Sequence, residues 1–234
     1  MKYAVIAAGQ GSRLVSDGIS VSKPLLEVNG EPLLQRLIAL FMRHNAESIA
    51  LIINEEMDDV KEFVTGLNLP IPLDLVVKST PDSLHSFYEL SVKIQHADKF
   101  CLTTVDPIFR EEEFSSYISA FQSDDNNDAL MAVTDFIDDE KPLYVKTDQN
   151  LNILGYENEY YANAQYVSGG IYCLNNKVLS LLPDVVKSGV TRMRGFQQAI
   201  IDAGLKAKAY PFSKIIDVDH ASDRKKAEEF IRNM

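Results

Sequence analysis

The start of the chain constrains the fold more than any other stretch, because a continuous apolar run ends there in a glycine-rich turn. Residues 2–8, apolar after their first lysine, are typical of a parallel strand buried on both faces. The turn that follows places glycine at alternate positions, Gly9 and Gly11. Because glycine tolerates positive φ and has no Cβ, successive amide groups in such a turn can converge on an anion. We therefore expect this turn to bind phosphate.

Two other phosphate-binding motifs could be read into this turn, and both fail. The P-loop requires Gly-Lys-Ser/Thr, whereas Leu14 stands five positions after Gly9 and no Lys-Ser/Thr pair follows. The dinucleotide fingerprint GxGxxG has Leu14 in place of its third glycine. What remains is a turn with two cations, Arg13 and Lys23. A planar guanidinium and a mobile ammonium beside one glycine turn suit a polyphosphate, although each cation alone is more typical of a solvated loop.

The two cations belong to a longer pattern in the first 34 residues. It reads Ala7-Ala8-Gly9-x-Gly11-x-Arg13-Leu14, then Lys23-Pro24-Leu25, then Val28-Asn29-Gly30-x-Pro32-Leu33-Leu34. This pattern resembles the opening signature of the nucleotidyltransferase superfamily, which includes sugar-1-phosphate nucleotidyltransferases, phosphocholine cytidylyltransferases and molybdenum cofactor guanylyltransferases. The resemblance implies a three-layer α/β/α, Rossmann-like fold with a mostly parallel central sheet and a small β insertion. It implies that Arg13 and Lys23 act in catalysis, and that the nucleotide is bound by Ala8, Gly9, Gly11, Ser12, Arg13 and Lys23.

The length and charge of the chain narrow its class. With 234 residues, 46% of them hydrophobic and 24% charged, it fits one domain, residues 1–234, with an insertion at about residues 138–166. The net charge of −11 argues against nucleic acid or an anionic membrane as a partner. No apolar run reaches the roughly 18 residues of a membrane span, and the N-terminus lacks a secretory pattern. We expect a cytoplasmic protein in which Cys101 and Cys173 are buried and reduced. We also expect no acyltransferase domain, because no repeat region follows.

Strands and helices alternate along the first half of the chain. Apolar runs at residues 48–53, 73–77 and 100–105 predict buried strands, and helical spacing of apolar residues predicts a helix over residues 31–44. Asn54, followed by acidic residues, is typical of the N-cap of a second helix. This alternation predicts parallel strands joined by right-handed crossovers. Further strands are expected at residues 129–136 and 206–210, and further helices at residues 114–121, 175–187 and 193–203.

A polar segment, residues 79–86, follows the third strand and opens a helix that extends to about residue 96. Open α/β sheets bind ligands at such positions, beyond the C-terminal end of a strand. The resemblance implies that this segment faces the nucleotide base, so Ser83 and Ser86 are candidates for contacts to base or ribose. The alternative is a Ser/Asp N-cap whose hydroxyls have no such role. The serines of this segment resemble those of cytidylyltransferase relatives, which favours CTP.

Three aspartates are candidate ligands of a divalent metal ion. Asp106 ends the fourth strand and precedes a proline, a position that suits a hard cation, although Asp-Pro is also a common turn former. Asp217 and Asp219 lie in a motif, residues 215–223, that resembles the closing motif of the family except that His220 replaces the usual threonine. The resemblance implies Mg²⁺ on Asp106 and on one of the later pair. Strand alternation places Asp217 and Asp219 on one face, and the choice between them stays open.

The stretch from residue 138 to residue 166 departs from the α/β alternation. Short strands at residues 143–147 and 151–156 around a turn predict a tyrosine-rich hairpin. The resemblance implies that this insertion forms a wall of the acceptor pocket and that Gly169 and Gly170 contact the acceptor. Paired glycines before a strand permit the close approach of a ligand, and they equally permit a β-bulge.

The predicted function is Mg²⁺-dependent transfer of a nucleotidyl group from an NTP to a sugar-1-phosphate or similar phosphomonoester, with release of pyrophosphate, in sugar nucleotide biosynthesis. A phosphate dianion is already a nucleophile, so this reaction needs positioning and charge neutralisation rather than a general base. The alternatives are a non-sugar acceptor such as phosphocholine or a molybdopterin-type cofactor, and a nucleotide-binding module without turnover. The missing third glycine disfavours a dinucleotide-dependent oxidoreductase. The expected partners are an NTP and a phosphorylated small molecule, and the oligomeric state is not predicted.

Overall fold

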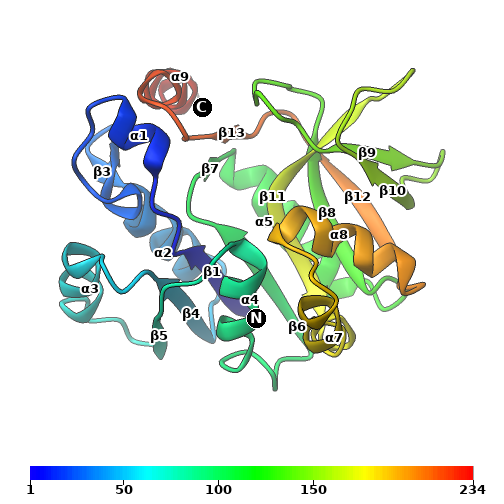
Figure 1. Cartoon of the computed structure of the whole chain (residues 1–234), viewed down its shortest axis with the longest axis horizontal. Coiled ribbons are helices and arrows are strands. Elements are labelled where there is room, and N and C mark those ends of the chain that lie inside the picture. Colours follow the sequence, from blue (N-terminus) through cyan, green and yellow to red (C-terminus); the bar gives the residue numbers. More distant parts are fainter. Residues whose placement is uncertain (234) are drawn as a thin grey trace.

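Within residues 1–233, which the computed structural model describes, a mixed sheet of nine strands forms the centre of the protein (Figure 1). Its strands are β1 (Lys2–Ala7), β4 (Ser48–Ile53), β5 (Leu73–Val77), β6 (Lys99–Thr104), β8 (Ala129–Thr134), β9 (Tyr144–Thr147), β10 (Ile153–Glu157), β11 (Tyr166–Asn175) and β12 (Ala207–Phe212). The order across the sheet is β10-β9-β11-β6-β1-β4-β5, and β8 pairs with both β11 and β12.

The middle of the sheet is parallel, as the alternation of strands and helices predicts. The strand β1 runs parallel to both β4 and β6, and β4 runs parallel to β5. The strand β11 is antiparallel to β6, β8 and β9, and it follows the β9–β10 hairpin rather than a crossover helix. The predicted insertion is therefore the point at which the sheet changes from parallel to antiparallel pairing.

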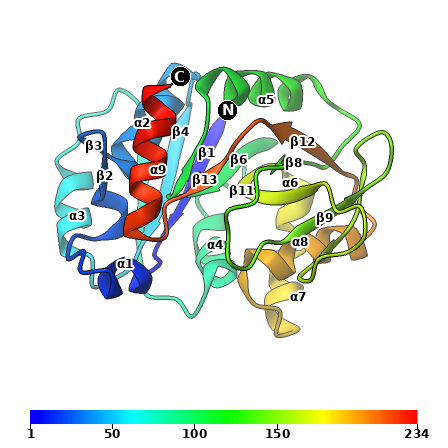
Figure 2. The ribbon, with the colours of Figure 1, turned by 90° about the horizontal axis from the view of Figure 1, so that it is seen from above.

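Helices cover both faces of the sheet (Figure 2). One face carries α2 (Leu33–Arg43), α3 (Asp58–Thr65), α5 (Glu111–Ser123) and α9 (Ala221–Arg232), and the other carries α4 (Ser83–Ser91), α6 (Asn176–Leu179), α7 (Leu182–Lys187) and α8 (Arg192–Asp202). Side chains of β1 alternate between the two cores, with Tyr3 and Val5 in the first and Ala4 and Ile6 in the second. The predicted three-layer α/β/α fold is confirmed.

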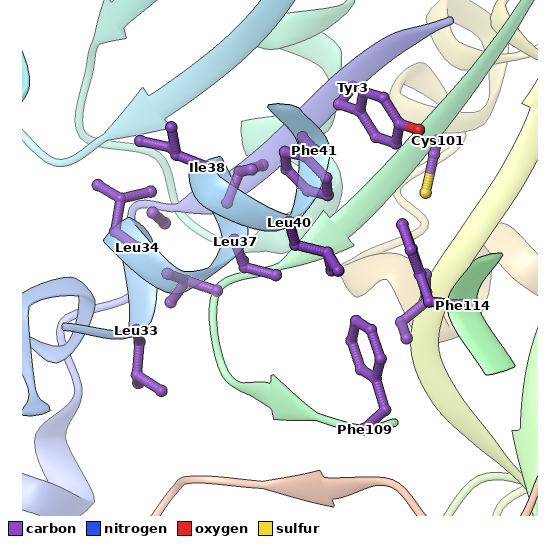
Figure 3. Packing of buried hydrophobic residues seen from close by; sticks show 14 of the residues in the cluster. Tyr3, Leu33, Leu34, Leu37, Ile38, Leu40, Phe41, Cys101, Phe109 and Phe114 are labelled. Atoms are coloured by element: carbon purple, nitrogen blue, oxygen red, sulfur yellow. The ribbon is translucent and has the colours of Figure 1, made fainter. Parts of the chain in front are cut away.

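Aromatic rings fill the core between α2, α5 and the sheet (Figure 3). The rings of Tyr3 and Phe41 stack with their centroids 4.3 Å apart, and the ring of Phe114 lies 6.3 Å from Tyr3 and 6.2 Å from Phe41. The Tyr3 hydroxyl donates to the backbone carbonyl of His44 at 3.0 Å, which satisfies the polar atom of this buried side chain. This cluster fixes α2 and α5 on the strand that leads into the glycine turn.

Several predicted helix limits are wrong, for local reasons. The helix α3 begins at Asp58 and not directly after Asn54, because the Asn54 side-chain oxygen accepts a hydrogen bond from the Glu56 backbone and closes a turn. The helix α2 begins later than predicted, because β3 (Glu31–Pro32) pairs with β2 (Glu27–Val28) in a small ribbon. The helix α4 is shorter than predicted, and α6 and α7 replace one predicted helix.

The two cysteines lie opposite each other on neighbouring strands, Cys101 on β6 and Cys173 on β11. Both are buried and free, as the sequence predicts. In the part of the chain that the structure describes, no helix combines the length and the apolar character that crossing a bilayer requires.

The aromatic cluster allows a direct test of this core. Phe114→Ala removes a fully buried ring, and we expect a loss of about 3–5 kcal/mol in the free energy of unfolding. Tyr160→Ala is the control, because Tyr160 is 68% exposed, and its change should stay within about 0.5 kcal/mol. Urea unfolding followed by circular dichroism measures both values. Equal losses in the two variants would contradict the described packing.

Candidate active site

The strand order reverses beside β1, and the candidate site lies there. The chain passes from β1 to β4 and β5 on one side and returns to β6 on the other side of β1. Open α/β sheets bind ligands at such a switch point, outside the carboxyl ends of the strands. Two cavities lie around this edge. The glycine-loop cavity, about 560 Å³, is lined by the turn after β1, residues 79–83 and the end of β6, and the acidic cavity, about 320 Å³, is lined by parts of residues 134–142, 167–169 and 215–226.

The structure divides the predicted site residues between these two cavities. The glycine-loop cavity is lined by Ala8, Gly9, Ser12, Lys23, Ser83, Ser86 and Asp106. The acidic cavity is lined by Arg13, Gly169, Asp217 and Asp219. Gly11 and Gly170 lie outside both linings as the described residues define them. Residues far apart in the sequence therefore meet at one edge of the sheet.

The glycine turn opens into the glycine-loop cavity. A Cβ on Gly9 would meet no atom within 4 Å, so the backbone there faces open space. Gly11 has φ +61° and precedes the short helix α1 (Ser12–Ser16), and a Cβ there would lie 3.3 Å from that of Lys23. Of the two glycines, Gly11 alone needs the left-handed conformation, so that part of the prediction is wrong for Gly9. Leu14 is 1% exposed and anchors α1 in the core, which accounts for leucine at this place in the motif.

The hydroxyls of Ser83 and Ser86 already have partners within the protein. The Ser83 hydroxyl accepts a hydrogen bond from the Met193 backbone at the start of α8, at 3.0 Å. The Ser86 hydroxyl lies 2.6 Å from that of Thr80 and donates to the Asp82 carbonyl. The Asp82 side chain caps α4, as the alternative interpretation of this segment requires. A contact from either serine to a nucleotide base stays a prediction.

Asn54 is a residue of this cavity that the sequence does not identify as such. It is 5% exposed, and its side-chain oxygen accepts from the Ser79 hydroxyl at 2.8 Å. Its amide nitrogen lies 3.5 Å from the carbonyl of Ala8. Asn54 thus connects the turn after β1 with the polar segment after β5. The position of this polar residue at the end of a buried strand could have indicated a place in the cavity, but it equally fits the simpler interpretation as a helix cap.

Lys23 lies between two carboxylates where the cavities meet. Its Nζ atom is 2.5 Å from Oδ2 of Asp106 and 2.6 Å from Oδ1 of Asp219. The other oxygen of Asp219 lies 2.7 Å from Nη1 of Arg13. Lys23 and Asp106 line the glycine-loop cavity, whereas Arg13 and Asp219 line the acidic cavity. We call these four residues the ion-pair chain, and it joins the two cavities.

The ion-pair chain keeps its buried members charged. Burial alone would lower the pKa of Lys23, but the carboxylates of Asp106 and Asp219 raise it above its ordinary value. Burial alone would raise the pKa of Asp106, but the ammonium of Lys23 holds it below its ordinary value. Both groups are therefore ionised across the neutral range.

Asp217 is held beside Asp106 by a two-stranded ribbon. The strand β13 (Ile216–Asp217) pairs with β7 (Pro107–Ile108), with Asp217 opposite Pro107. Burial and then the charge of Asp106 raise the pKa of Asp217 well above its ordinary value. Oδ1 of Asp106 and Oδ1 of Asp217 are both buried and have no hydrogen-bond partner within the described residues. Two neighbouring carboxylates thus present unpartnered oxygens.

These two oxygens fit the predicted Mg²⁺. In residues 1–233, no group of three or more His, Cys, Asp or Glu side chains is arranged to hold a metal ion. Mg²⁺ does not require such a group, because it is commonly bound by one or two carboxylates together with substrate phosphates and water. The prediction that strand alternation places Asp217 and Asp219 on one face is wrong, because β13 ends at Asp217 and Asp219 lies beyond it. Both residues nevertheless line the acidic cavity. Which of the two meets the metal stays a prediction.

The glycines of β11 pack against protein atoms. A Cβ on Gly169 would meet the end of the Ile215 side chain and lie 3.3 Å from the carbonyl oxygen of Ala132, so β11 packs closely on both residues here. Gly170 has φ +72°. Pairing of β11 with β8 shifts register between Ser168 and Tyr172, which makes these glycines part of a β-bulge. Gly169 also lines the acidic cavity, and its contact with an acceptor stays a prediction.

The acidic cavity also contains residues that the sequence does not single out. The predicted insertion contributes Asp138, Asp139, Glu140 and Pro142 to the lining of this cavity. Within the described chain, no tyrosine of the insertion lines the cavity. His220 lies at the start of α9, and its Nδ1 is 3.1 Å from Oδ2 of Asp17, in the loop after α1. The replacement of threonine by His220 therefore leaves the turn intact and adds a contact to the glycine-turn side of the site.

Similar proteins share this fold. The chain is 26% identical to the "Bifunctional protein GlmU" of Methanococcus maripaludis strain C5 over 191 residues, which are 80% of this chain and 43% of that protein. It thus spans less than half the length of this relative. The solved structure of the inositol-1-phosphate CTP transferase from T. maritima matches with a TM-score of 0.83 and 24% identity, over 99% of this chain and 94% of that chain. A putative glucose-1-phosphate thymidylyltransferase from Bacillus anthracis, in complex with a sucrose, matches with a TM-score of 0.85 and 20% identity, over 100% and 96%.

The fold that carries this site is the nucleotidyltransferase fold of the two solved structures. Residues 3–160, more than half of the chain, match the family described as the MobA-like NTP transferase domain. The chain belongs to this family. The resemblance seen in the first 34 residues is confirmed, and the dinucleotide-dependent oxidoreductase is not supported.

The unpartnered carboxylate of Asp217 predicts an unusual stability change. At pH 7 and in EDTA, Asp217→Asn should raise the free energy of unfolding, because burial and the charge of Asp106 disfavour the charged form of Asp217 in the folded state. The raised pKa means that the native carboxyl is protonated in acid, so the gain should vanish as the pH falls. Asp219→Asn is the matched control and should destabilise, because it removes a partner of Lys23 and of Arg13. Urea unfolding at pH 4 and pH 7 measures both, and destabilisation by Asp217→Asn at pH 7 would contradict this assignment.

Proposed function

We propose that the protein transfers a nucleotidyl group from an NTP to a sugar-1-phosphate or similar phosphomonoester in a Mg²⁺-dependent reaction that releases pyrophosphate. The observation that carries this proposal is the ion-pair chain at the junction of two cavities. Two substrates need two adjacent pockets, and the reacting phosphates must meet where cations and carboxylates are concentrated. The family of the chain supports the same reaction class.

In this proposal the glycine-loop cavity takes the NTP. The turn at Gly9 offers backbone amides to the β- and γ-phosphates. Arg13, which lines the acidic cavity and pairs with Asp219, adds a guanidinium from the junction of the two cavities. Lys23 stabilises the charge that develops on the α-phosphate. An oxygen of the acceptor phosphate attacks the α-phosphorus in line, a new P–O bond forms, and the bond to the bridging oxygen of pyrophosphate breaks.

The ion-pair chain must change partners for this to happen. Without substrate, Arg13 and Lys23 are neutralised by Asp106 and Asp219. When the NTP binds, its phosphates take over Arg13 and Lys23. Mg²⁺ held by Asp106 with Asp217 or Asp219 would supply positive charge between the reacting phosphates. Because the acceptor phosphate is already an anion, no side chain needs to remove a proton from it.

Two features of this proposal are left open by the site. The serine-containing segment at residues 79–86 favours CTP, and CTP is therefore the first nucleotide to test. Phosphocholine and a molybdopterin-type cofactor are alternative acceptors, and a binding module without turnover is the alternative function. The cytoplasmic location and the single-domain organisation stay predictions.

The proposal is tested by ligand-induced stabilisation and by turnover. An NTP at 100 times its Kd adds about 2.7 kcal/mol, or roughly 5–11 °C in Tm for a chain of this length. We expect one of ATP, CTP, GTP and UTP to give such a shift with Mg²⁺, and pyrophosphate release to follow on addition of an acceptor. Arg13→Ala should lower kcat/KM about 10²–10³-fold, because it removes a fixed cation from the phosphates.

Arg43→Ala is the control for the loss of an arginine. Arg43, at the end of α2, pairs with Glu111 at the start of α5. It lines neither cavity of the site, so this variant should keep its activity. A nucleotide shift without pyrophosphate release from any acceptor would favour the binding module. No shift with any of the four nucleotides would overturn the proposed function.

A further inference from the structure

The acidic cavity has an excess of negative charge. It is lined by six carboxylates, namely Asp138, Asp139, Glu140, Asp217, Asp219 and Asp223. The lysine and arginine residues in its lining are Arg13 and Lys226. A cavity that received only the phosphate end of a substrate would be expected to have the opposite balance.

Three of the six carboxylates are neutralised within the protein. Asp219 pairs with Arg13, and Asp138 and Asp223 pair with Lys226 at 2.6 Å and 3.3 Å. Asp217 is one of the carboxylates that fit Mg²⁺. Asp139 and Glu140 have no lysine or arginine partner in the described chain, and the nearest basic atom to Glu140 is Nε2 of His220 at 3.8 Å.

The loop that carries Asp139 and Glu140 is fixed in place. Nη2 of Arg194, on α8, donates to the carbonyl of Lys141 at 2.6 Å. Nη1 of the same arginine donates to the side chain of Asn158 at 3.1 Å. On the other side, Asp138 holds Lys226 of α9. The backbone of this loop is thus anchored by Arg194 and by the ion pair of Asp138 with Lys226.

The same cavity has apolar lining. Pro142, Val167 and Ile215 contribute to it, together with Phe136, whose ring centroid lies 4.0 Å from the ammonium of Lys214. Apolar surface beside uncompensated negative charge suits an organic cation, whose alkyl groups pack on the wall while the carboxylates balance its charge. An acceptor with a second anionic group would be repelled.

We propose that the acceptor is a phosphomonoester that carries a cationic amine, and that Asp139 and Glu140 select it. This inference rests on the proposed function, because it names the acceptor class of that reaction. The phosphate of the acceptor lies at the ion-pair chain, and its ammonium group lies by the loop of Asp139 and Glu140.

The test compares acceptors that differ in one charge. Phosphocholine is paired with 3,3-dimethylbutyl phosphate, in which carbon replaces the quaternary nitrogen, and glucosamine-1-phosphate is paired with glucose-1-phosphate. Initial rates of pyrophosphate release give kcat/KM for each. We expect the cationic member of at least one pair to be favoured by about tenfold or more, with the preference falling as salt is added.

Variants separate charge from hydrogen bonding. The double variant Asp139→Asn with Glu140→Gln keeps oxygens that can accept hydrogen bonds from sugar hydroxyls but removes both charges. It should bring the preference for the cationic member close to one, mainly by lowering kcat/KM for that member. Glu229→Gln removes a charge from α9 outside the cavity and should leave the preference at the wild-type value. Both positions of the double variant are exposed, so the fold should be unaffected.

The outcomes distinguish this inference from the proposed function. Equal use of both members of each pair, or a preference that the double variant leaves intact, would overturn the inference and leave the nucleotidyltransferase reaction standing. An NTP-induced shift in Tm without turnover of any cationic phosphate would overturn it as well. Absence of any NTP-induced shift would overturn the proposed function itself.

Discussion

The ammonium of Lys23 between Asp106 and Asp219 is the interaction on which the rest of the site depends. It connects the segment after α1 with the end of β6 and the approach to α9, and the last two segments are also joined by the β7–β13 ribbon and by a backbone hydrogen bond from Val218 to Asp106. Its side chain is 10% exposed, so without these carboxylates its charge would be costly to bury. The same interaction keeps the ammonium of Lys23 and the carboxylates of Asp106 and Asp219 mutually neutralised.

The sheet topology explains why two cavities meet at this point. The order reversal beside β1 opens an edge where the glycine turn and Asp106 are neighbours. The β7–β13 ribbon then returns the end of the chain to the same place and adds Asp217. The antiparallel half of the sheet, which begins at the insertion, supplies the acidic cavity. In the proposed function, the parallel half of the sheet therefore carries the nucleotide pocket and the antiparallel half carries the acceptor pocket.

Local patterns predicted the framework of the site, and long-range contacts decided the rest. The strand β1, the turn at Gly11 and the position of Asp106 follow from neighbouring residues, and the structure has all three. The partner of the Ser83 hydroxyl is Met193, 110 residues away, so the sequence could not show that this hydroxyl is engaged. Likewise, the consecutive acidic residues Asp138, Asp139 and Glu140 follow no pattern that would identify them as site residues. Only the fold places them in the lining of a cavity.

In the proposed function, the NTP phosphates replace the carboxylates of Asp106 and Asp219 as partners of Lys23 and Arg13, and Mg²⁺ binds the carboxylates that are released. The most direct measurement is the Kd of the preferred NTP by isothermal titration calorimetry in EDTA and in saturating Mg²⁺. We predict that Mg²⁺ tightens NTP binding at least about tenfold, a coupling of about 1.4 kcal/mol, because Asp106 and Asp219 otherwise compete with the phosphates for Lys23 and Arg13. The same Kd with and without Mg²⁺ would contradict it.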